Sequence, residues 1–411
     1  MSLIIYGIIL RVYRLGICVA SLFNKKARLW IQGRKNLIIQ IKKEIGTDEK
    51  IIWVHCASLG EFEQGRPVIE ALRKNMPSCK ILLTFFSPSG YEIRKNYSGA
   101  DYIFYLPLDT GKNAREFLQA VKPTAAIFVK YEFWYHYLEE LKKNNIPAYL
   151  VSGIFRKRQW FFRWYGAFFR NVLRSFNFLF VQNQESARLL KSIGILQCSV
   201  AGDTRFDRVY DIAMNAKPNV VVEKFAGRKK VIVAGSTWKQ DEELLIKYIN
   251  DSEKKVRWII APHEIHKENI LRIRKEIEKS SVTYSALTEN PDIRAEVLII
   301  DNVGMLSSLY RHGNIAYVGG GFGKGIHNIL EPATFGMPVV FGPNYKKFRE
   351  ACELVEKGGA IPVNNYSDLK MILDKLILET EAHRKAGDIS KEYIKNNLGS
   401  TQLIVDKLLN N

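Results

Sequence analysis

The chain has 411 residues, of which 47% are apolar and 25% charged, and this composition excludes disordered and low-complexity proteins. A prior of about 150 residues per domain predicts two or three domains, and we favour two. Lys and Arg number 61 against 42 acidic residues, a formal charge of +19 that favours nucleic acid, anionic lipid or a phosphorylated substrate as partner. The five cysteines are scattered and odd in number, which argues against a disulfide framework or a zinc cluster.

Residues 2–23 are apolar apart from a few positions. On a helix the exceptions share one narrow stripe, namely Gly7, Arg11, Arg14 and Ser21. This pattern is typical of a helix that lies in a membrane interface, since two arginines in the middle disfavour a lipid-spanning helix. The basic residues at 25, 26 and 28 would hold that end on the cytoplasmic side. We therefore predict a membrane-associated helix over 1–30; the alternative is an ordinary helix packed on the body.

From residue 50 onward, short apolar runs alternate with helical patterns such as 63–75 and 113–120, which predicts parallel sheets. The expected strands are 51–55, 80–86, 102–107, 125–129, 148–152 and 178–182, then 230–234, 257–261, 297–301, 314–318 and 338–341. A polar stretch at 217–219 separates the two sets, so we place a boundary near residue 215. The expected architecture is α/β, with doubly wound domains over 31–215 and 216–390 facing a central cleft. Residues 391–411 are predicted to form a helix that closes the assembly, with a return to the first domain as one expected course.

The motif HCASLGEFEQGRP at 55–67 follows a predicted strand and opens a helix. Glu61 lies at this junction, where a shielded carboxylate can act as a general base; the alternative is a capping role for Glu61 or Glu63. Glu132 in KYEFW and Arg205 in GDTRFD also follow strands, and each is alternatively a surface ion-pair residue.

Two further segments leave alternatives open. The run 155–178 interleaves basic and aromatic residues, a pattern that suits anionic headgroups, single-stranded nucleic acid or a solvated face over a core helix. His263 and His266 lack the spacing of a helical zinc signature, so we expect no metal site.

The segment 319–343, GGGFGKGIHNILEPATFGMPVVFGP, is a glycine-rich loop that leads into a short helix and then a strand. Glycines allow close approach of a ligand, and a helix N-terminus favours phosphate. Asn328 and Glu331 are expected on one face, where Glu331 can accept hydrogen bonds from two ribose hydroxyls. The alternative is a tight turn with Glu331 as the capping carboxylate.

Eight motifs in chain order resemble the Kdo transferase family, which moves 3-deoxy-D-manno-octulosonic acid (Kdo) from CMP-Kdo to lipid A precursor. They are GRK near residue 33, ASLGE, KYEFW, VQNQES, GDTRFD, AGST, DNVGMLSSLY and GIHNILEPATFGMPVVFGP. The resemblance implies a GT-B fold and an inverting transfer without metal, with Glu61 as base and with Glu132 and Arg205 stabilising the transition state. It places CMP against Pro262, His263, Val303, Gly304, Met305, Asn328, Ile329, Leu330 and Glu331.

This sequence departs from the commoner family pattern at four positions. The family usually has arginine at His263, glutamate at Met305, lysine at Arg205 and glycine at Ile326. Arg205 keeps the charge, whereas His263 replaces a permanent cation only in part.

These observations predict a Kdo transferase on the cytoplasmic side of the inner membrane. Its expected partners are CMP-Kdo, lipid A precursor and anionic membrane lipid, with no metal cofactor and no nucleic acid. One alternative is another GT-B transferase or a nucleotide-sugar epimerase. A second is a basic nucleic-acid-binding protein without activity.

Overall fold

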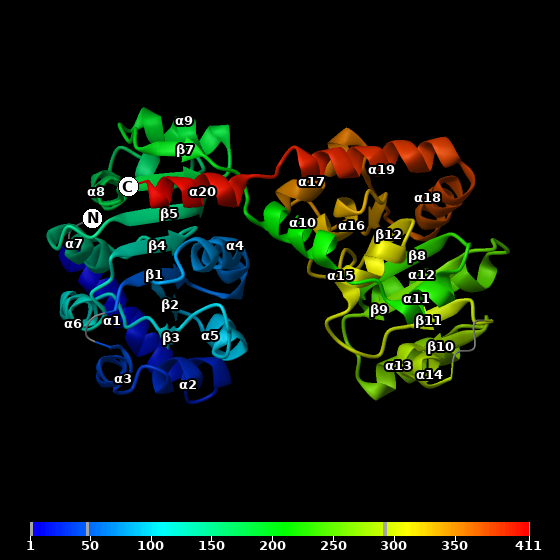
Figure 1. The fold of residues 1–411 in the computed structure, drawn as a ribbon, viewed down its shortest axis with the longest axis horizontal. Helices are drawn as coiled ribbons and strands as arrows, with labels where there is room; N and C mark the ends of the chain where they lie inside the picture. The colour runs from blue at the N-terminus through cyan, green and yellow to red at the C-terminus, as the bar shows by residue number, and fades with distance from the viewer. Residues whose placement is uncertain (1–2, 47–48, 291–293, 411) are drawn as a thin grey trace. The chain divides into compact units, whose positions relative to one another are not determined.

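A computed structural model describes residues 3–46, 49–290 and 294–410 of the chain. Its internal contacts divide it into two compact units. Unit 1 comprises Met1–Asp207 and Leu398–Asn411, and unit 2 comprises Arg208–Asn397. Figure 1 shows that each unit is a sheet with helices on both faces.

Unit 1 contains a seven-stranded parallel sheet in the order β3-β2-β1-β4-β5-β6-β7. Its strands are β1 (Ile51–Cys56), β2 (Lys80–Phe85), β3 (Tyr102–Tyr105), β4 (Ala125–Val129), β5 (Ala148–Gly153), β6 (Phe178–Val181) and β7 (Cys198–Val200). Successive side chains point to opposite faces, so Trp53 and Phe128 enter one core while Val54 and Ile127 enter the other. Burial on both faces explains why most residues of these strands are apolar.

Most helices of unit 1 connect successive strands, whereas α1, α2 and α3 precede β1 and α20 is the last element of the chain. The helices of this unit are α1 (Leu3–Ala20), α2 (Lys25–Gln32), α3 (Leu37–Glu44), α4 (Leu59–Asn75), α5 (Pro88–Arg94), α6 (Gly111–Val121), α7 (Tyr135–Lys143), the 3-10 helix η1 (Trp160–Phe162), α8 (Ala167–Arg174), α9 (Gln184–Ser192) and α20 (Ser400–Leu409). Ile404 and Val405 of α20 lie in the same core as Val68 and Leu72 of α4. The last helix of the chain is therefore part of unit 1.

Unit 2 repeats this plan with the strand order β10-β11-β9-β8-β12-β13-β14, all parallel. Its strands are β8 (Val231–Thr237), β9 (Arg257–Pro262), β10 (Ser281–Thr283), β11 (Val297–Ile299), β12 (Ile315–Val318), β13 (Val339–Phe341) and β14 (Ala360–Pro362). Its helices are α11 (Val220–Ala226), α12 (Lys239–Asp251), α13 (Lys267–Glu276), α14 (Tyr284–Glu289), α15 (Leu306–Leu309), η2 (Tyr310–His312), α16 (Leu330–Thr334), α17 (Arg349–Lys357), α18 (Tyr366–Leu378) and α19 (Thr380–Lys395), while α10 (Arg205–Asn215) begins in unit 1 and ends in unit 2.

All the strands expected from the sequence are present, and the two-sheet α/β architecture is confirmed. The boundary between the units lies between residues 207 and 208, inside α10, whereas the sequence placed it near residue 215. The polar stretch at 217–219 lies beyond the end of α10. The single helix expected over 391–411 is two helices, since Gly399 has a φ of 98° and separates α19 from α20. Helix α19 ends at Lys395, and Gly399 is the residue before the start of α20; glycine adopts this left-handed backbone without steric cost.

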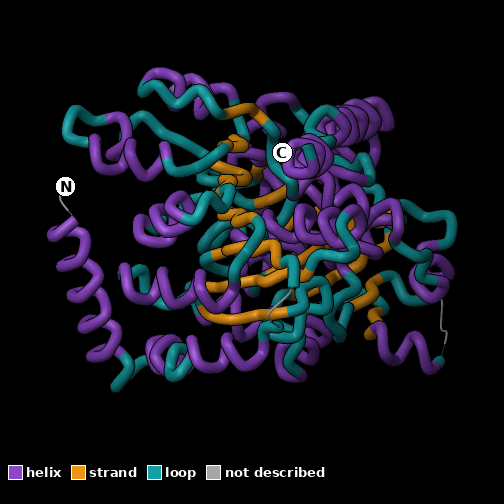
Figure 2. Tube along the Cα trace, turned by 60° about the vertical axis from the view of Figure 1, so that its left-hand side comes forward, coloured by secondary structure: helices purple, strands orange, loops and turns teal. Residues whose placement is uncertain are grey.

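Helix α1 lies on the outside of unit 1 with one side against the body (Figure 2). Leu10 is buried with Trp30 and Leu108, and the Tyr6 hydroxyl donates to the buried Asp109 carboxylate at 2.5 Å. Ile4 and other apolar residues on the remaining sides are exposed. By length and composition alone, α1 is also apolar enough to cross a membrane.

Candidate active site

Glu61 stands in the first turn of α4, directly after strand β1. Its carboxylate is half-buried and accepts a hydrogen bond from the Ser58 hydroxyl, the residue at the helix N-cap. The unpaired N–H groups at a helix N-terminus favour a negative charge there. The structure thus places Glu61 where the sequence predicts it, with Ser58 as a partner that the sequence analysis did not identify.

Glu132 follows strand β4 and is almost fully buried, with 8% of its surface exposed. Lys130 has a φ of 67°, and this left-handed residue turns the chain sharply after the strand. The Oε2 atom of Glu132 accepts a hydrogen bond from Trp134 Nε1 at 2.7 Å and lies 3.1 Å from His55 Nε2. A buried carboxylate needs such partners because it has lost its hydration.

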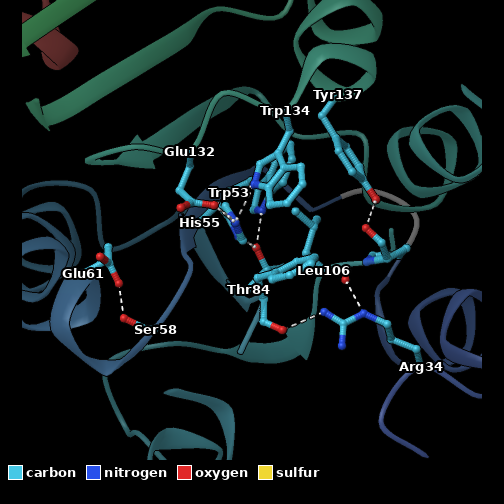
Figure 3. A network of polar contacts seen from close by, with 12 residues as sticks. Arg34, Trp53, His55, Ser58, Glu61, Thr84, Leu106, Glu132, Trp134 and Tyr137 are labelled. Carbon is cyan, nitrogen blue, oxygen red and sulfur yellow. Dashed lines mark hydrogen bonds and ion pairs between the residues drawn. The ribbon is translucent and has the colours of Figure 1, made fainter. Parts of the chain in front are cut away.

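A chain of polar side chains continues from His55 into the sheet (Figure 3). His55 is paired in register with Thr84 on the neighbouring strand, and Trp53 lies two residues away on the same face of β1. The Thr84 hydroxyl lies 2.9 Å from His55 Nδ1 and accepts a hydrogen bond from Trp53 Nε1 at 2.8 Å. All three side chains are fully buried.

Glu61 and Glu132 lie at the same edge of the unit 1 sheet (Figure 3). Burial raises the pKa of Cys56 well above its usual value, and the charges of Glu61 and Glu132 raise it further. The topology explains this arrangement, because β1 and β4 are parallel neighbours and end at the same edge.

Arg205 lies beside the helix that carries Glu61, yet its guanidinium is engaged. The hydroxyl of the preceding residue, Thr204, donates to the Gln64 carbonyl of α4 at 2.5 Å. Arg205 donates to the Asp203 carboxylate through Nε at 2.9 Å and Nη2 at 2.7 Å. In this structure the charge of Arg205 is therefore compensated by Asp203.

A cavity of about 730 Å³ lies in unit 1 beside α1. It is lined by Arg14, Cys18, Trp30, Ile31, Arg34, Lys35, Asn36, Leu37, Ile38, Ile39, Pro107, Leu108, Thr110, Lys112 and Asn113. Four of these residues are basic and none is acidic. Such a lining suits a ligand with both anionic and apolar parts.

Arg34 from the GRK motif lines this cavity and also binds backbone carbonyls that follow strands β2 and β3. Its guanidinium donates to the carbonyls of Leu106 and Phe86 at 2.9 and 2.8 Å and lies 3.9 Å from the centre of the Trp30 ring. Burial lowers its pKa to about 9, so that it remains charged at neutral pH. Gly33 is required beside it, because a Cβ there would meet the Tyr105 ring at 2.2 Å.

In unit 2, Asn328 and Glu331 contact each other at the start of α16. Asn328 Nδ2 donates to Glu331 Oε1 at 3.0 Å, and the Ser307 hydroxyl donates to Glu331 Oε2. Asn328 Oδ1 also accepts the backbone N–H of Leu330, the first residue of α16, at 3.1 Å. The N-cap residue is Ile329, and Glu331 makes no capping hydrogen bond to this helix. Ser307 follows the loop of Val303, Gly304 and Met305, and its hydrogen bond brings that predicted segment beside Glu331.

His263 stands after β9 and stacks on Trp238 with ring centroids 4.4 Å apart. The ring centroids of His327 and His263 lie 4.7 Å apart, and His327 Nε2 accepts a hydrogen bond from Trp238 Nε1 at 3.0 Å. Burial and the charge of His263 both lower the pKa of His327. Because His327 precedes Asn328, this aromatic group joins the segment of Pro262 and His263 to the glycine-rich loop.

The glycine-rich loop is packed mainly against its own unit. A Cβ at Gly319 would meet the Ser236 carbonyl oxygen at 2.3 Å, and one at Gly321 would meet the Gly342 nitrogen at 2.5 Å. Ile326, Ile329 and Leu330 are buried. The side chains of Ile329 and Leu330 are therefore not available to a ligand, and Ile326 fills buried space at the position where glycine was expected.

No group of three or more His, Cys, Asp or Glu side chains within 3–46, 49–290 and 294–410 is placed to hold a metal ion. The predicted reaction without metal stays a prediction.

Residues 31–208 match the sequence profile of the family described as 3-deoxy-D-manno-octulosonic-acid transferase (kdotransferase). The chain is 28% identical over 368 residues to 3-deoxy-D-manno-octulosonic acid transferase of Aquifex aeolicus (strain VF5), covering 86% of this chain and 94% of that protein. It is 25% identical over 394 residues to the protein of that name from Rickettsia typhi, covering 93% of this chain and 83% of the relative.

Among solved structures, the chain is similar to UDP-GlcNAc 2-epimerase from Neisseria meningitidis bound to UDP-GlcNAc, with a TM-score of 0.60 and 19% identity over 88% of this chain and 100% of that one. It is also similar to MurG of Acinetobacter baumannii, with a TM-score of 0.55 and 12% identity over the same shares. At these identities the likeness concerns the fold alone, and it confirms the predicted GT-B architecture.

Proposed function

We propose, from the premise that this chain belongs to the 3-deoxy-D-manno-octulosonic-acid transferase family and is a glycosyltransferase, that it moves Kdo from CMP-Kdo to a hydroxyl of lipid A precursor. One observation carries the proposal. Glu61 follows β1 and Glu132 follows β4, and because these strands are parallel neighbours both residues lie at one edge of the unit 1 sheet, within the segment that matches the family profile.

Glu61 is the proposed general base. Its carboxylate takes the proton of the acceptor hydroxyl while that oxygen bonds to the anomeric carbon of Kdo, and CMP leaves with the electrons of the broken bond. Attack from the face opposite CMP inverts the anomeric centre. Ser58 holds the Glu61 side chain in place through its hydrogen bond.

Glu132 is the proposed stabiliser of the positive charge that develops on the sugar. A carboxylate held in a buried site acts on such a charge more strongly than it would in water. The negative charge on the leaving CMP requires cations or N–H groups, and Arg205 serves this role in the proposal when its pairing with Asp203 opens.

Unit 2 is the proposed donor site. Glu331, held by Asn328 and Ser307, would accept hydrogen bonds from the ribose hydroxyls of CMP. The aromatic group of Trp238, His263 and His327 supplies ring faces beside it. His263 and Met305 remain the positions where nucleotide contacts differ from those of the commoner family pattern.

The acceptor and the membrane are assigned to unit 1. The basic and apolar lining of the cavity beside α1 suits a phosphorylated lipid, and the exposed side of α1 suits a bilayer on the cytoplasmic side of the inner membrane. The segment 155–166 adds exposed aromatic residues, among them Trp164 at 90% exposure, and α8 behind it contacts α1 through Phe168 and Tyr6.

Incubation of the purified full-length chain with CMP-Kdo and tetra-acyl lipid A precursor tests the proposal. We expect release of CMP and an acceptor whose mass increases by whole Kdo units. A parallel reaction with UDP-GlcNAc tests the alternative of an epimerase. Epimerisation of UDP-GlcNAc together with an unchanged lipid acceptor would contradict the proposal.

A further inference from the structure

We infer that His55 is a positioning residue that carries its single ring proton on Nε2 and directs it to Glu132, with Thr84 and Trp53 selecting this tautomer. The hydrogen bonding of the buried side chains carries this inference. Its consequence for sugar transfer rests on the proposed function, whereas the tautomer itself does not.

The hydrogen bonds of the Thr84 hydroxyl determine which nitrogen of His55 is protonated. Trp53 Nε1 can only donate, so Thr84 Oγ1 must accept this hydrogen bond. The hydroxyl proton of Thr84 then needs an acceptor, and His55 Nδ1 at 2.9 Å is the remaining hydrogen-bond partner of Thr84 among the described residues. Thr84 is fully buried, so water does not replace that partner. His55 Nδ1 is therefore an unprotonated acceptor.

The other end of the imidazole agrees with this assignment. With Nδ1 unprotonated, Nε2 carries the proton and donates to Glu132 Oε2 at 3.1 Å. Trp134 Nε1 donates to the same oxygen at 2.7 Å. Trp134 Nε1 is also placed to donate to His55 Nε2 at 3.2 Å. We assign its one proton to Glu132 Oε2, which is closer at 2.7 Å and carries more negative charge than a ring nitrogen.

The competing protonation states each leave a buried group unpaired. A proton on Nδ1 alone would turn the lone pair of Nε2 toward the Glu132 carboxylate and leave the Thr84 proton without an acceptor. A doubly protonated ring would also leave that proton without an acceptor. An unpaired buried polar group keeps the full desolvation cost, which disfavours both states.

The two oxygens of Glu132 therefore have different surroundings. Oε2 receives two N–H donors and is fixed, whereas Oε1 makes no hydrogen bond with the residues that the structure describes. Oε1 is thus the oxygen that would face the developing positive charge, and His55 acts on the reaction only through Glu132.

Nitrogen-15 NMR of the full-length chain labelled at its seven histidines tests the tautomer directly. The His55 signals are assigned by their loss in His55→Gln. We expect a protonated Nε2 and an unprotonated Nδ1 in the wild-type protein. A protonated Nδ1, alone or with Nε2, would overturn the inference whatever reaction the enzyme performs.

Thr84→Val and Thr84→Ser then separate hydrogen bonding from packing. Valine keeps the shape of Thr84 but lacks its hydroxyl, so we expect kcat for Kdo transfer to fall about tenfold or more with KM little changed. Serine restores the hydroxyl and should recover most of the loss together with the wild-type tautomer. The control is Thr124→Val, which removes a hydroxyl at the opposite end of the same sheet, bonded to the Ile51 carbonyl.

The outcomes distinguish this inference from the proposed function. If the wild type shows the predicted tautomer but transfers no Kdo, the proposed function fails and the assignment of His55 stands. If the wild type transfers Kdo and folded Thr84→Val retains wild-type kcat, the positioning role is overturned.

Discussion

Glu331 illustrates how neighbouring side chains determine the role of a single carboxylate. The sequence leaves open a capping role or a role in ribose binding, and in the structure Glu331 accepts hydrogen bonds from the Ser307 and Asn328 side chains and makes none to the helix N-terminus. Because each carboxylate oxygen can accept more than one hydrogen bond, Glu331 can also accept ligand hydroxyls.

We therefore expect Glu331→Gln to weaken CMP binding by about tenfold, since a hydrogen bond to a charged group contributes more than one to a neutral amide. Isothermal titration of the purified protein with CMP measures the change. The exposed residue Glu289 on α14 supplies the matched control, Glu289→Gln, which should bind CMP like the wild type. Equal dissociation constants for the two variants would exclude Glu331 from the nucleotide site.

The places of Glu61 and Glu132 after their strands were predictable from the motifs, whereas the hydrogen-bond partners of Glu132 were not. Glu61 and Glu132 stand out because each follows a strand. His55 was passed over because its partners Thr84 and Glu132 lie 29 and 77 positions away, and only the register of the sheet brings them together. The glycines at 319 and 321 suggested ligand contact, but they allow close packing between backbone segments.

At the scale of elements, α1 combines a side that packs on unit 1 with sides that do not. Leu10 is buried, while Val12 and Leu15 are 63% and 65% exposed. The structure also links this helix to the proposed site. Tyr6 donates to Asp109, and Asp109 accepts the backbone N–H groups of His136 and Tyr137 at the start of α7, directly after Trp134.

Replacing Val12 and Leu15 together by serine should weaken binding to anionic vesicles by about tenfold or more, because two apolar side chains no longer enter the bilayer. Co-sedimentation with vesicles measures the effect, and CMP binding should stay unchanged. Leu378→Ser is the control, since Leu378 on α18 is also 61% exposed. If the double variant and the control sediment alike, α1 is not the membrane contact.

Asp101 ties three elements of unit 1 together and makes its stability dependent on pH. Burial raises the pKa of this carboxyl, but the Ile81 amide, Arg73 and Lys80 outweigh burial and hold the pKa below its usual value of 3.8. A lowered folded-state pKa means that the stabilisation is present above pH 3.8 and is lost as the pH falls through the folded-state pKa.

Asp101→Asn should therefore lower the free energy of unfolding by about 1–3 kcal/mol at neutral pH, and its difference from wild type should shrink at acid pH. Urea unfolding measured across a pH series gives both values. Asp388→Asn changes an exposed carboxylate on α19 and should follow the wild type throughout. A difference that grows toward acid pH would refute the role assigned to Asp101.

The central strands were predictable because they are apolar over four or more residues. The edge strands β7, β10 and β14 have three residues each and contain partly exposed positions, so they lack a periodic signal. Pairing with a neighbour, rather than local sequence, defines them as strands.

For the whole molecule, the repetition of one sheet plan in two units is the feature that the alternating pattern predicted. The return of the chain to unit 1 depends on contacts distant in sequence. Asp207 accepts the backbone N–H groups of Gly399 and Thr401, each at 2.6 Å, and so caps the start of α20. The profile match over 31–208 falls in the same unit as the two carboxylates.

A single-turnover comparison of the wild type and Glu61→Gln tests the central claim most directly. Both proteins are saturated with CMP-Kdo and lipid A precursor, and the acceptor is resolved by mass over time. We predict a Kdo-bearing lipid from the wild type and a rate at least about a hundredfold lower from Glu61→Gln, which should still bind CMP. A wild type that yields no Kdo-bearing lipid, or a folded Glu61→Gln that matches its rate, would contradict the account.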